Sequence, residues 1–313
     1  MAIDVNNTIP TDMPDENSNV QSSVTNSTFV GENNVSQQTN NNDSQSEDSN
    51  DPNKIKVTIT DERAPIVVLF GPPSCGKTMT LVRLSRYLYR EGFKVEVDAE
   101  FKAKTDSHYQ ELIKTFDSMV ESEKAATGTD LISFLLVKVS DKQGKTICQI
   151  LEAPGEHYFN PNDSKAVFPK YVNTIIQSNN RKIYSIFVEP SWDEASSRKG
   201  YVERVKKLST MMSNGDKVLF IFNKIDKTNF VIRPGVISMN NAIKNIMDLY
   251  PNMFEAFKNQ NPITKFFKKF NCEVVPFQTG MYNGTVDGGL MYTQSDDIYP
   301  KILWNKLYSL VRG

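Results

Sequence analysis

An apolar segment, residues 66–70, runs directly into a glycine-bounded loop with the chemistry to bind phosphate. The loop is Gly71-Pro72-Pro73-Ser74-Cys75-Gly76-Lys77-Thr78. Leu81, Leu84 and Leu88 then recur at helical spacing, so the predicted order is strand, loop and helix. The backbone N–H groups of such a loop and the positive end of the following helix point at one place and attract an anion. An ordinary glycine-containing turn is the competing interpretation, and a match over the whole loop in this context disfavours it.

The last two residues of the loop have the side chains that a nucleoside triphosphate requires. The Lys77 ammonium can reach the outer phosphates, and the Thr78 hydroxyl can ligate Mg²⁺. The other predicted contacts to the phosphates come from the loop itself, at Gly71, Ser74, Cys75 and Gly76. This loop alone does not distinguish GTPases, ATPases and kinases.

A second loop has the residues to distinguish the purine bases. Residues 218–222 are apolar and predict a buried strand, which is followed by Asn223-Lys224-Ile225-Asp226. A carboxylate at Asp226 can accept two hydrogen bonds from guanine, whereas adenine offers no such pair of donors. Asn223 can connect this loop to the phosphate loop, and the Lys224 stem can lie along the base. A polar surface turn is the competing interpretation, because such residues are frequent at strand ends.

A third strand, predicted over residues 146–151, ends in Glu152-Ala153-Pro154-Gly155-Glu156-His157. Three strand-end loops in this order resemble the P-loop GTPases of the Ras-like and translation-factor kind, and the resemblance covers about residues 62–313. It implies an α/β fold with three layers. The sheet would be mostly parallel and six-stranded, with one antiparallel hairpin pair, and helices would cover both faces.

The resemblance also implies roles for the third loop. Gly155 would sense the γ-phosphate through its N–H, and Glu152 stands where the family usually has the Asp that holds magnesium through a water. Glu156 replaces the Gln that orients the attacking water in Ras-like members, and a carboxylate beside a phosphate meets like-charge repulsion. His157 lies one residue beyond the His of translation-type members, so it could orient the water or be an ordinary loop residue. We therefore expect hydrolysis to be slow.

Two further family features have weaker matches. Thr105 is the candidate for the first-switch threonine that closes over magnesium, although the same stretch can begin a helix, with Ser107 and Gln110 spaced as a capping box. Gln278 and Thr279 follow the last predicted strand and are the candidates for the loop that backs the guanine base.

Composition divides the chain of 313 residues in two. Residues 1–55 are rich in Asn, Ser, Gln and Thr and have few large apolar side chains, which predicts a disordered tail. Nine of the 37 acidic residues precede Lys54, so the rest of the chain carries 28 acids and 36 bases, a net charge of about +8. Residues 56–313 predict one GTPase-like domain with a helix inserted near 107–124. The other predicted helices lie near 165–179, 197–213, 238–259 and 297–311.

The composition also argues against several classes of protein. Three cysteines suggest no disulfide framework and fit a reducing cytoplasm, and two histidines make a zinc site implausible. No segment predicts a membrane span or a signal peptide. The lysines and phenylalanines of residues 258–270 suggest the end of a helix more than a nucleic-acid or membrane surface.

The sequence therefore predicts a guanine-nucleotide-binding protein that uses GTP, GDP and Mg²⁺, hydrolyses GTP slowly and acts as a switch with a protein effector or regulator. Two alternatives stay open. One is an interaction module that binds nucleotide without turnover, and the other is a P-loop ATPase.

Overall fold

The computed structural model describes most of the chain from Asp51 onward. The described residues are 51–122, 134–161, 163, 165–192, 194–262, 265, 269–284 and 290–313. The tail predicted over residues 1–55 therefore lies outside the described residues, apart from its last five.

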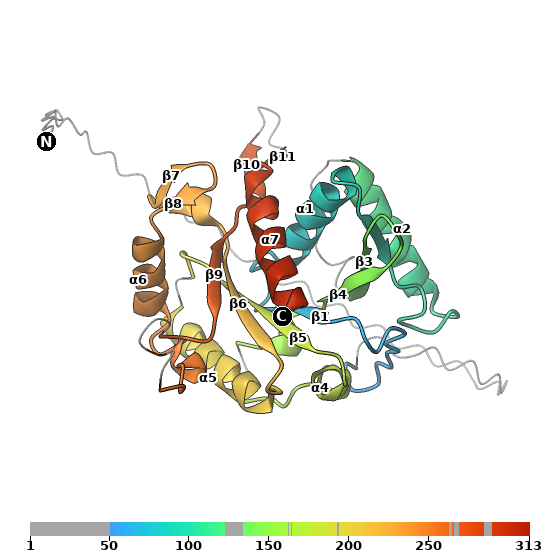
Figure 1. Ribbon diagram of the computed structural model, residues 1–313, viewed down its shortest axis with the longest axis horizontal. Coiled ribbons are helices and arrows are strands. Elements are labelled where there is room, and N and C mark those ends of the chain that lie inside the picture. The colour runs from blue at the N-terminus through green and yellow to red at the C-terminus, as the bar shows by residue number, and fades with distance from the viewer. Residues whose placement is uncertain are drawn as a thin grey trace, which may run out of the picture. The chain divides into compact units, whose positions relative to one another are not determined.

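A seven-stranded sheet forms the centre of the described structure (Figure 1), in the order β2-β3-β4-β1-β5-β6-β9. Its strands are β1 Ile66–Phe70, β2 Lys94–Val97, β3 Leu135–Ser140, β4 Thr146–Glu152, β5 Lys182–Val188, β6 Lys217–Phe222 and β9 Glu273–Pro276. Every residue of β1 and β5 is buried, as expected for central strands that are covered on both faces. The sheet has one strand more than the six expected, because the short β2 pairs with β3 at the edge.

The strand β3 runs antiparallel to both of its neighbours, and the other pairings of the sheet are parallel. A tight turn connects β3 to β4, as the sequence predicts. Gly144 in this turn has a φ of 80°, and the Asp141 carboxylate accepts hydrogen bonds from the backbone N–H groups of Gln143 and Lys145.

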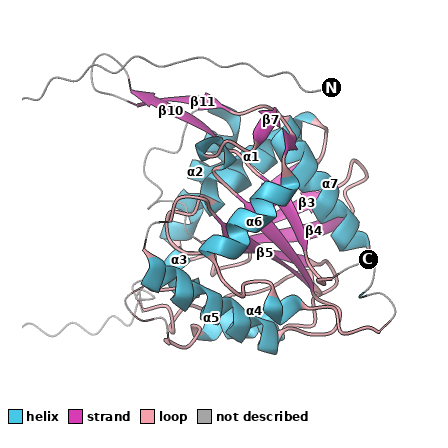
Figure 2. Cartoon of the chain, turned by 90° about the vertical axis from the view of Figure 1, so that its left-hand side faces the viewer, coloured by secondary structure: helices cyan, strands magenta, loops and turns pink. Residues whose placement is uncertain are grey.

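Helices cover both faces of the sheet, which gives the three layers expected. The α-helices are α1 Lys77–Arg90, α2 Ser107–Ser122, α3 Gly155–Tyr158, α4 Lys170–Gln177, α5 Ala195–Met211, α6 Met239–Leu249 and α7 Ile298–Arg312. Helix α1 contacts α2 and α7. Figures 1 and 2 show α4 and α5 together on the opposite side of the sheet.

The inserted helix α2 packs into the core. Tyr109, Leu112 and Phe116 on its inner face are buried. The helix begins at Ser107 as predicted, but its cap is Asp106, whose carboxylate accepts a hydrogen bond of 2.9 Å from the N–H of Tyr109. This side chain takes the capping role that the sequence assigned to Ser107.

Two hairpins outside the main sheet were not predicted. They are β7–β8, with strands Val231–Arg233 and Val236–Ile237, and β10–β11, with strands Gly280–Gly284 and Leu290–Gln294. The short 3₁₀ helix η2, Ile225–Lys227, precedes β7, and a second one, η3, spans Glu255–Phe257. Figures 1 and 2 show both hairpins at the same end of the molecule as drawn. Each hairpin follows one of the two loops predicted to contact the base.

Candidate nucleotide-binding site

The predicted loops follow neighbouring strands of the sheet. Strands β4, β1, β5, β6 and β9 are adjacent and parallel in this order. Their carboxyl ends therefore meet at one edge, where ligands bind in open α/β sheets. The phosphate loop follows β1, the loop with Gly155 follows β4, and the loop with Asn223 follows β6.

The phosphate loop has the backbone that only glycine tolerates at its critical turn. Gly76 has a φ of 91°, and a Cβ at this position would overlap the side-chain amide of Asn223. The Lys77 side chain bends back over the loop, where its Nζ lies 3.3 Å from the Gly71 carbonyl oxygen and 3.2 Å from that of Pro72. Both acceptors are uncharged and do not neutralise the ammonium, which can therefore attract an anion bound in the loop.

The side chain of Cys75 lies beneath the backbone of this loop, and its thiol is unreactive. Its side chain is buried, and burial raises the pKa of the Cys75 thiol to about 11. A Cβ on Gly71 would be 2.6 Å from the Cys75 Sγ, so a larger residue at Gly71 would displace the thiol. The thiol therefore fills space under the cradle, and the backbone faces the ligand.

The two residues predicted to hold magnesium are in direct contact. The Thr78 hydroxyl donates a hydrogen bond of 2.9 Å to Oε1 of Glu152. Glu152 is 2 % exposed, and its other oxygen, Oε2, is buried without a hydrogen-bond partner among the described residues. Burial raises the pKa of Glu152 to about 7, while Lys77 and Thr78 act in the opposite direction.

This pair fits a hard divalent cation. Mg²⁺ prefers oxygen ligands, and it would give Glu152 Oε2 the charged partner that the described protein residues do not provide. The longer side chain of Glu, compared with the Asp of the resembled family, does not prevent the carboxylate from reaching Thr78.

Gly155 lies against the phosphate loop. A Cβ at this position would overlap the backbone of Pro72 and Pro73, so the chain can approach this closely only at a glycine. Gly155 is also the first residue of the short helix α3. The structure thus brings the third predicted loop into contact with the first.

The two residues after Gly155 differ in their surroundings. Glu156 is exposed. His157 is half-buried, and its Nδ1 lies 2.7 Å from the hydroxyl oxygen of Tyr171 on α4. Burial lowers the pKa of His157 to about 4; Glu156 raises it, and the cations Lys77 and Lys102 lower it further. His157 is therefore neutral at pH 7. Tyr171 was not identified from the sequence.

On the base side, Asn223 connects two loops as predicted. Its side-chain Nδ2 donates a hydrogen bond of 2.8 Å to the Cys75 carbonyl oxygen. Lys224 follows with a φ of 54°, and its Nζ donates a hydrogen bond of 3.0 Å to the Ser74 carbonyl oxygen. Asp226 lies in η2, exposed and with no hydrogen-bond or ion-pair partner in the described part of the chain. Its carboxylate is accessible to a ligand.

Gln278 and Thr279 lie beside that loop. The N–H of Ile225 donates a hydrogen bond of 3.4 Å to the carbonyl oxygen of Phe277, the residue before Gln278. Ser295, just after β11, holds the candidate residues: its hydroxyl donates to the Gln278 carbonyl oxygen at 2.6 Å, and its N–H donates to the Thr279 carbonyl oxygen at 3.3 Å.

The same serine connects the base side to α1. The buried guanidinium of Arg83 on α1 donates a hydrogen bond of 2.7 Å to the Ser295 carbonyl oxygen. Neither Arg83 nor Ser295 was identified from the sequence. Both residues stabilise the loop predicted to back the guanine base.

Thr105 remains apart from the other candidates. It lies in the exposed turn before α2, and no hydrogen bond joins it to Thr78 or Glu152 in the described part of the chain. Its assignment as the first-switch threonine stays a prediction.

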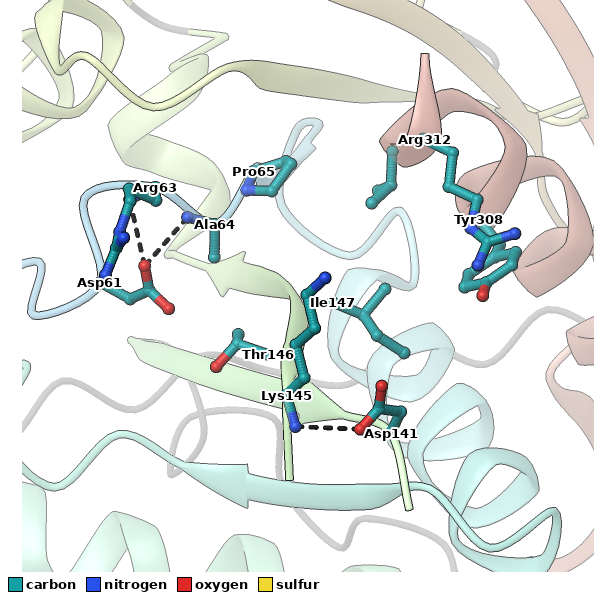
Figure 3. A pocket seen from close by; sticks show the side chains of 11 residues that line it. Asp61, Arg63, Ala64, Pro65, Asp141, Lys145, Thr146, Ile147, Tyr308 and Arg312 are labelled. Atoms are coloured by element: carbon teal, nitrogen blue, oxygen red, sulfur yellow. Dashed lines mark hydrogen bonds between the residues drawn. The ribbon is translucent and has the colours of Figure 1, made fainter. Parts of the chain in front are cut away.

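A separate pocket opens at the opposite edge of the sheet, next to the first residues of β1 and β4 (Figure 3). Its lining includes three cationic side chains, Arg63, Lys145 and Arg312. Asp61 and Asp141 also line it, and their carboxylates accept hydrogen bonds from backbone N–H groups. None of the predicted nucleotide contacts borders this pocket.

Other expectations concern metals, thiols and membranes. Cys75, Cys148 and Cys272, all among the described residues, form no disulfide there. Among the described residues there is no cluster of three or more His, Cys, Asp or Glu side chains placed to hold a metal ion. In the same residues, every helix is too short or too polar to cross a bilayer.

No protein-family model matches the sequence, and no curated protein matches it. Among solved structures, the chain is similar to a protein described as nucleolar GTP-binding protein 1 from Plasmodium falciparum. The identity is 13 %, the TM-score is 0.41, and the match covers 82 % of this chain and 90 % of that one.

Two further neighbours are structures with bound GDP. One is the GTPase-like domain of Ski7 from S. cerevisiae, bound to GDP and inorganic phosphate, with 12 % identity, a TM-score of 0.41 and coverage of 80 % of this chain and 50 % of that one. The other is Roco2 from Methanosarcina barkeri, with 14 % identity, a TM-score of 0.34 and coverage of 82 % and 52 %. This chain spans about half the length of each of these two.

The descriptions of these three neighbours name GTP binding, bound GDP and a GTPase-like domain, respectively. Their low TM-scores and identities support no inference about activity. The functional conclusions therefore depend on the geometry of this chain.

Proposed function

We propose that this protein binds GTP and GDP together with Mg²⁺, hydrolyses GTP slowly and acts as a molecular switch. The observation that carries the proposal is the hydrogen bond from Asn223 to the Cys75 carbonyl oxygen. It fixes the loop with the exposed Asp226 carboxylate next to the phosphate cradle, so one ligand can contact both.

Selection of guanine would come from Asp226. Its carboxylate can accept the N1–H and the exocyclic amine of guanine, two donors that adenine lacks at these positions. When adenine binds, the carboxylate would lose its hydrogen bonds to water and gain none from the base, which costs about 1–3 kcal/mol or more. The stem of Lys224 would support the face of the base.

The phosphates would be held by the loop backbone and by Lys77, with Thr78 and Glu152 as the magnesium-side residues. Mg²⁺ would supply charge neutralisation at the outer phosphates. Lys77 would add a fixed positive charge at the same place, and this preorganised charge is the main contribution that the chain itself makes to phosphoryl transfer.

Slow hydrolysis follows from the residues after Gly155. Glu156 has no neutral amide with which to orient a water beside a phosphate. Repulsion from the phosphate would also keep its carboxylate away from the place where that water binds. His157 is neutral, but the Tyr171 hydroxyl occupies its Nδ1. A partner that rearranges this segment could raise the rate, so the proposal includes a protein effector or regulator. It also includes a cytoplasmic location for this protein.

A module that binds nucleotide without turnover is the second candidate, favoured by the engagement of His157 with Tyr171. The ATPase alternative has no observation in its favour, because an adenine site has no use for an exposed carboxylate at Asp226.

Equilibrium binding and turnover test the proposal together. We expect GTP and GDP to bind at least about a hundredfold more tightly than ATP, with Mg²⁺ strengthening GTP binding. Phosphate release from prebound GTP should be slow but measurable. No phosphate release, even with cell extract, would favour the binding module, and equal affinity for ATP would reject the proposed function.

A further inference from the structure

Glu189 lies between the two halves of the proposed site. It follows directly after β5, the strand that separates β1 from β6 in the sheet. Val188 is in register with Phe222, the last residue of β6, so Glu189 lies level with Asn223 and Lys224. The carboxylate therefore emerges at the sheet edge where the phosphate loop and the base loop meet.

The Glu189 carboxylate pairs with the lysine predicted to support the base. Its Oε2 forms an ion pair with the Lys224 Nζ, which also donates a hydrogen bond of 3.0 Å to the Ser74 carbonyl oxygen. The Glu189 side chain is 12 % exposed and that of Lys224 is 28 % exposed. Because solvent screens this pair only partly, its geometry is more constrained than that of a surface ion pair.

The backbone at Glu189 is also fixed. The hydroxyl of Tyr250, a buried residue at the end of α6, accepts a hydrogen bond of 3.2 Å from the Glu189 N–H and donates one of 2.9 Å to its carbonyl oxygen. The Tyr250 ring packs against Trp192 and Tyr201. The aromatic cluster thus fixes the backbone position from which the Glu189 side chain extends.

Lys224 needs such a partner more than most lysines do. Its φ of 54° is in the left-handed region, which is unfavourable for a residue with a Cβ. The ion pair and the bond to Ser74 hold the side chain in the direction that this backbone sets. The ammonium is thereby kept at the phosphate loop, and the apolar stem lies between the two loops.

The two lysines of the site therefore differ in their charge balance. The Lys77 Nζ hydrogen-bonds to two carbonyl oxygens of the loop and interacts with the Glu152 carboxylate electrostatically, whereas Lys224 forms a direct ion pair with Glu189. The loop backbone therefore holds the Lys77 side chain, and a carboxylate partner holds that of Lys224.

We propose that Glu189 is a positioning residue that sets the stem of Lys224 as a platform for the purine base. This inference rests on the proposed function. It assigns a role in base binding to a residue that acts on the ligand only through another side chain.

The test is a double-mutant cycle measured by titration calorimetry with GMP, GDP and GTP in the presence of Mg²⁺. Glu189→Gln should weaken all three ligands by the same factor, about tenfold, because the three share the base and differ only in phosphates. In the Lys224→Met background the same substitution should change affinity by less than about twofold, since the side chain that it positions is gone. Glu203→Gln, which breaks an exposed ion pair with Lys206 on α5, is the matched control and should leave all affinities unchanged.

Two results would overturn the inference. Tighter binding of Glu189→Gln that grows from GMP to GTP would show that Glu189 is only a negative charge near the phosphates. Losses that add independently in the double variant would show that it does not act through Lys224.

If Glu189→Gln does not fold, Glu189→Asp makes the same comparison. Glu189→Asp keeps the charge but shortens the side chain by one methylene. A smaller loss of nucleotide affinity that disappears in the Lys224→Met background supports the inference, and unchanged affinity rejects it. Failure of the proposed function is a separate result, because it shows in the wild-type protein as an absence of preference for guanine nucleotides.

Discussion

The base side and the hydrolysis side of the proposed site are built differently. On the base side, the buried Asn223 amide joins two loops through the Cys75 carbonyl oxygen, and Lys224 adds a second connection at Ser74. On the hydrolysis side, Glu156 and Thr105 are exposed, and His157 is bonded to Tyr171. Recognition is therefore preorganised in this chain, whereas hydrolysis requires a rearrangement.

Preorganisation affects how much of the contact energy appears as nucleotide affinity. A loop that is already fixed loses little conformational entropy when a ligand binds, so more of the contact energy appears as affinity. An exposed residue must be ordered before it can act on the phosphates. We thus expect affinity to respond strongly to changes on the base side and the rate of hydrolysis to respond to changes after Gly155.

The largest expected effect comes from breaking the connection between the loops. Asn223→Ala should weaken GDP and GTP about a hundredfold, because the buried Cys75 carbonyl loses its partner and the base loop separates from the cradle. Binding by fluorescence with a labelled GDP measures the change. Asn173→Ala is the control, since Asn173 on α4 donates a similar side-chain bond to the Phe168 carbonyl oxygen. An equal loss of affinity in this variant would contradict the role given to Asn223.

Magnesium dependence should follow Glu152. Glu152→Gln removes the charge beside Thr78, so the gain in GTP affinity that Mg²⁺ provides should fall about tenfold, while affinity measured in EDTA should stay within about twofold. Titrations with and without Mg²⁺ give both numbers. A variant that keeps the full magnesium effect would show that Glu152 is not at the metal site.

Substitution of Glu156 should change the rate of GTP hydrolysis without changing GDP affinity. Glu156→Gln should raise the single-turnover rate of GTP hydrolysis several-fold, up to about tenfold, because a neutral amide can orient a water that a carboxylate repels. GDP affinity should not change, since the Glu156 side chain is exposed. A wild-type rate equal to or faster than that of the variant would refute this explanation of slow turnover.

A further expected effect is a pH dependence of stability at His157. Its pKa of about 4 in the folded state lies below the value near 6.5 of an unfolded chain, so the unfolded state binds the proton first as the pH falls. The stabilisation is complete above pH 6.5 and is lost between pH 6.5 and 4, by about 1–2 kcal/mol at pH 5.

Urea unfolding at pH 7.5 and pH 5 measures this loss. His157→Gln should remove this part of the acid destabilisation, and His108→Gln, at an exposed position on α2, is the control. Equal pH dependence of the wild type and His157→Gln would contradict the burial of the ring.

The motifs of the site could be recognised from the sequence because each is local. Residues 71–78 follow a strand and begin a helix, and Asn223 and Asp226 follow another strand at fixed spacing. Parallel neighbouring strands then bring these loops together without further information. The contact between Thr78 and Glu152, which are 74 residues apart, follows from the same topology.

Other parts of the site depend on contacts that no local pattern encodes. Glu189 and Tyr171 acquire their roles from partners on other elements, and Ser295 becomes important because the β10–β11 hairpin returns it to the base loop. The β7–β8 hairpin is different, because its signal was present: Pro234-Gly235 lies between two β-branched segments, and Gly235 has a φ of 74°. Asp106 competed successfully with Ser107 for the helix cap, since both are good capping residues and only the backbone geometry decides.

The most direct test of the account is a reciprocal change of base preference at Asp226. We expect the wild-type protein to bind GDP at least about a hundredfold more tightly than xanthosine diphosphate. Asp226→Asn should reverse this order, because the asparagine amide can donate a hydrogen bond to the oxygen that replaces the exocyclic amine. Calorimetric titration of both proteins with both ligands measures the four affinities. If the ratio of the two affinities is the same in both proteins, Asp226 does not read the base and the proposed site is wrong.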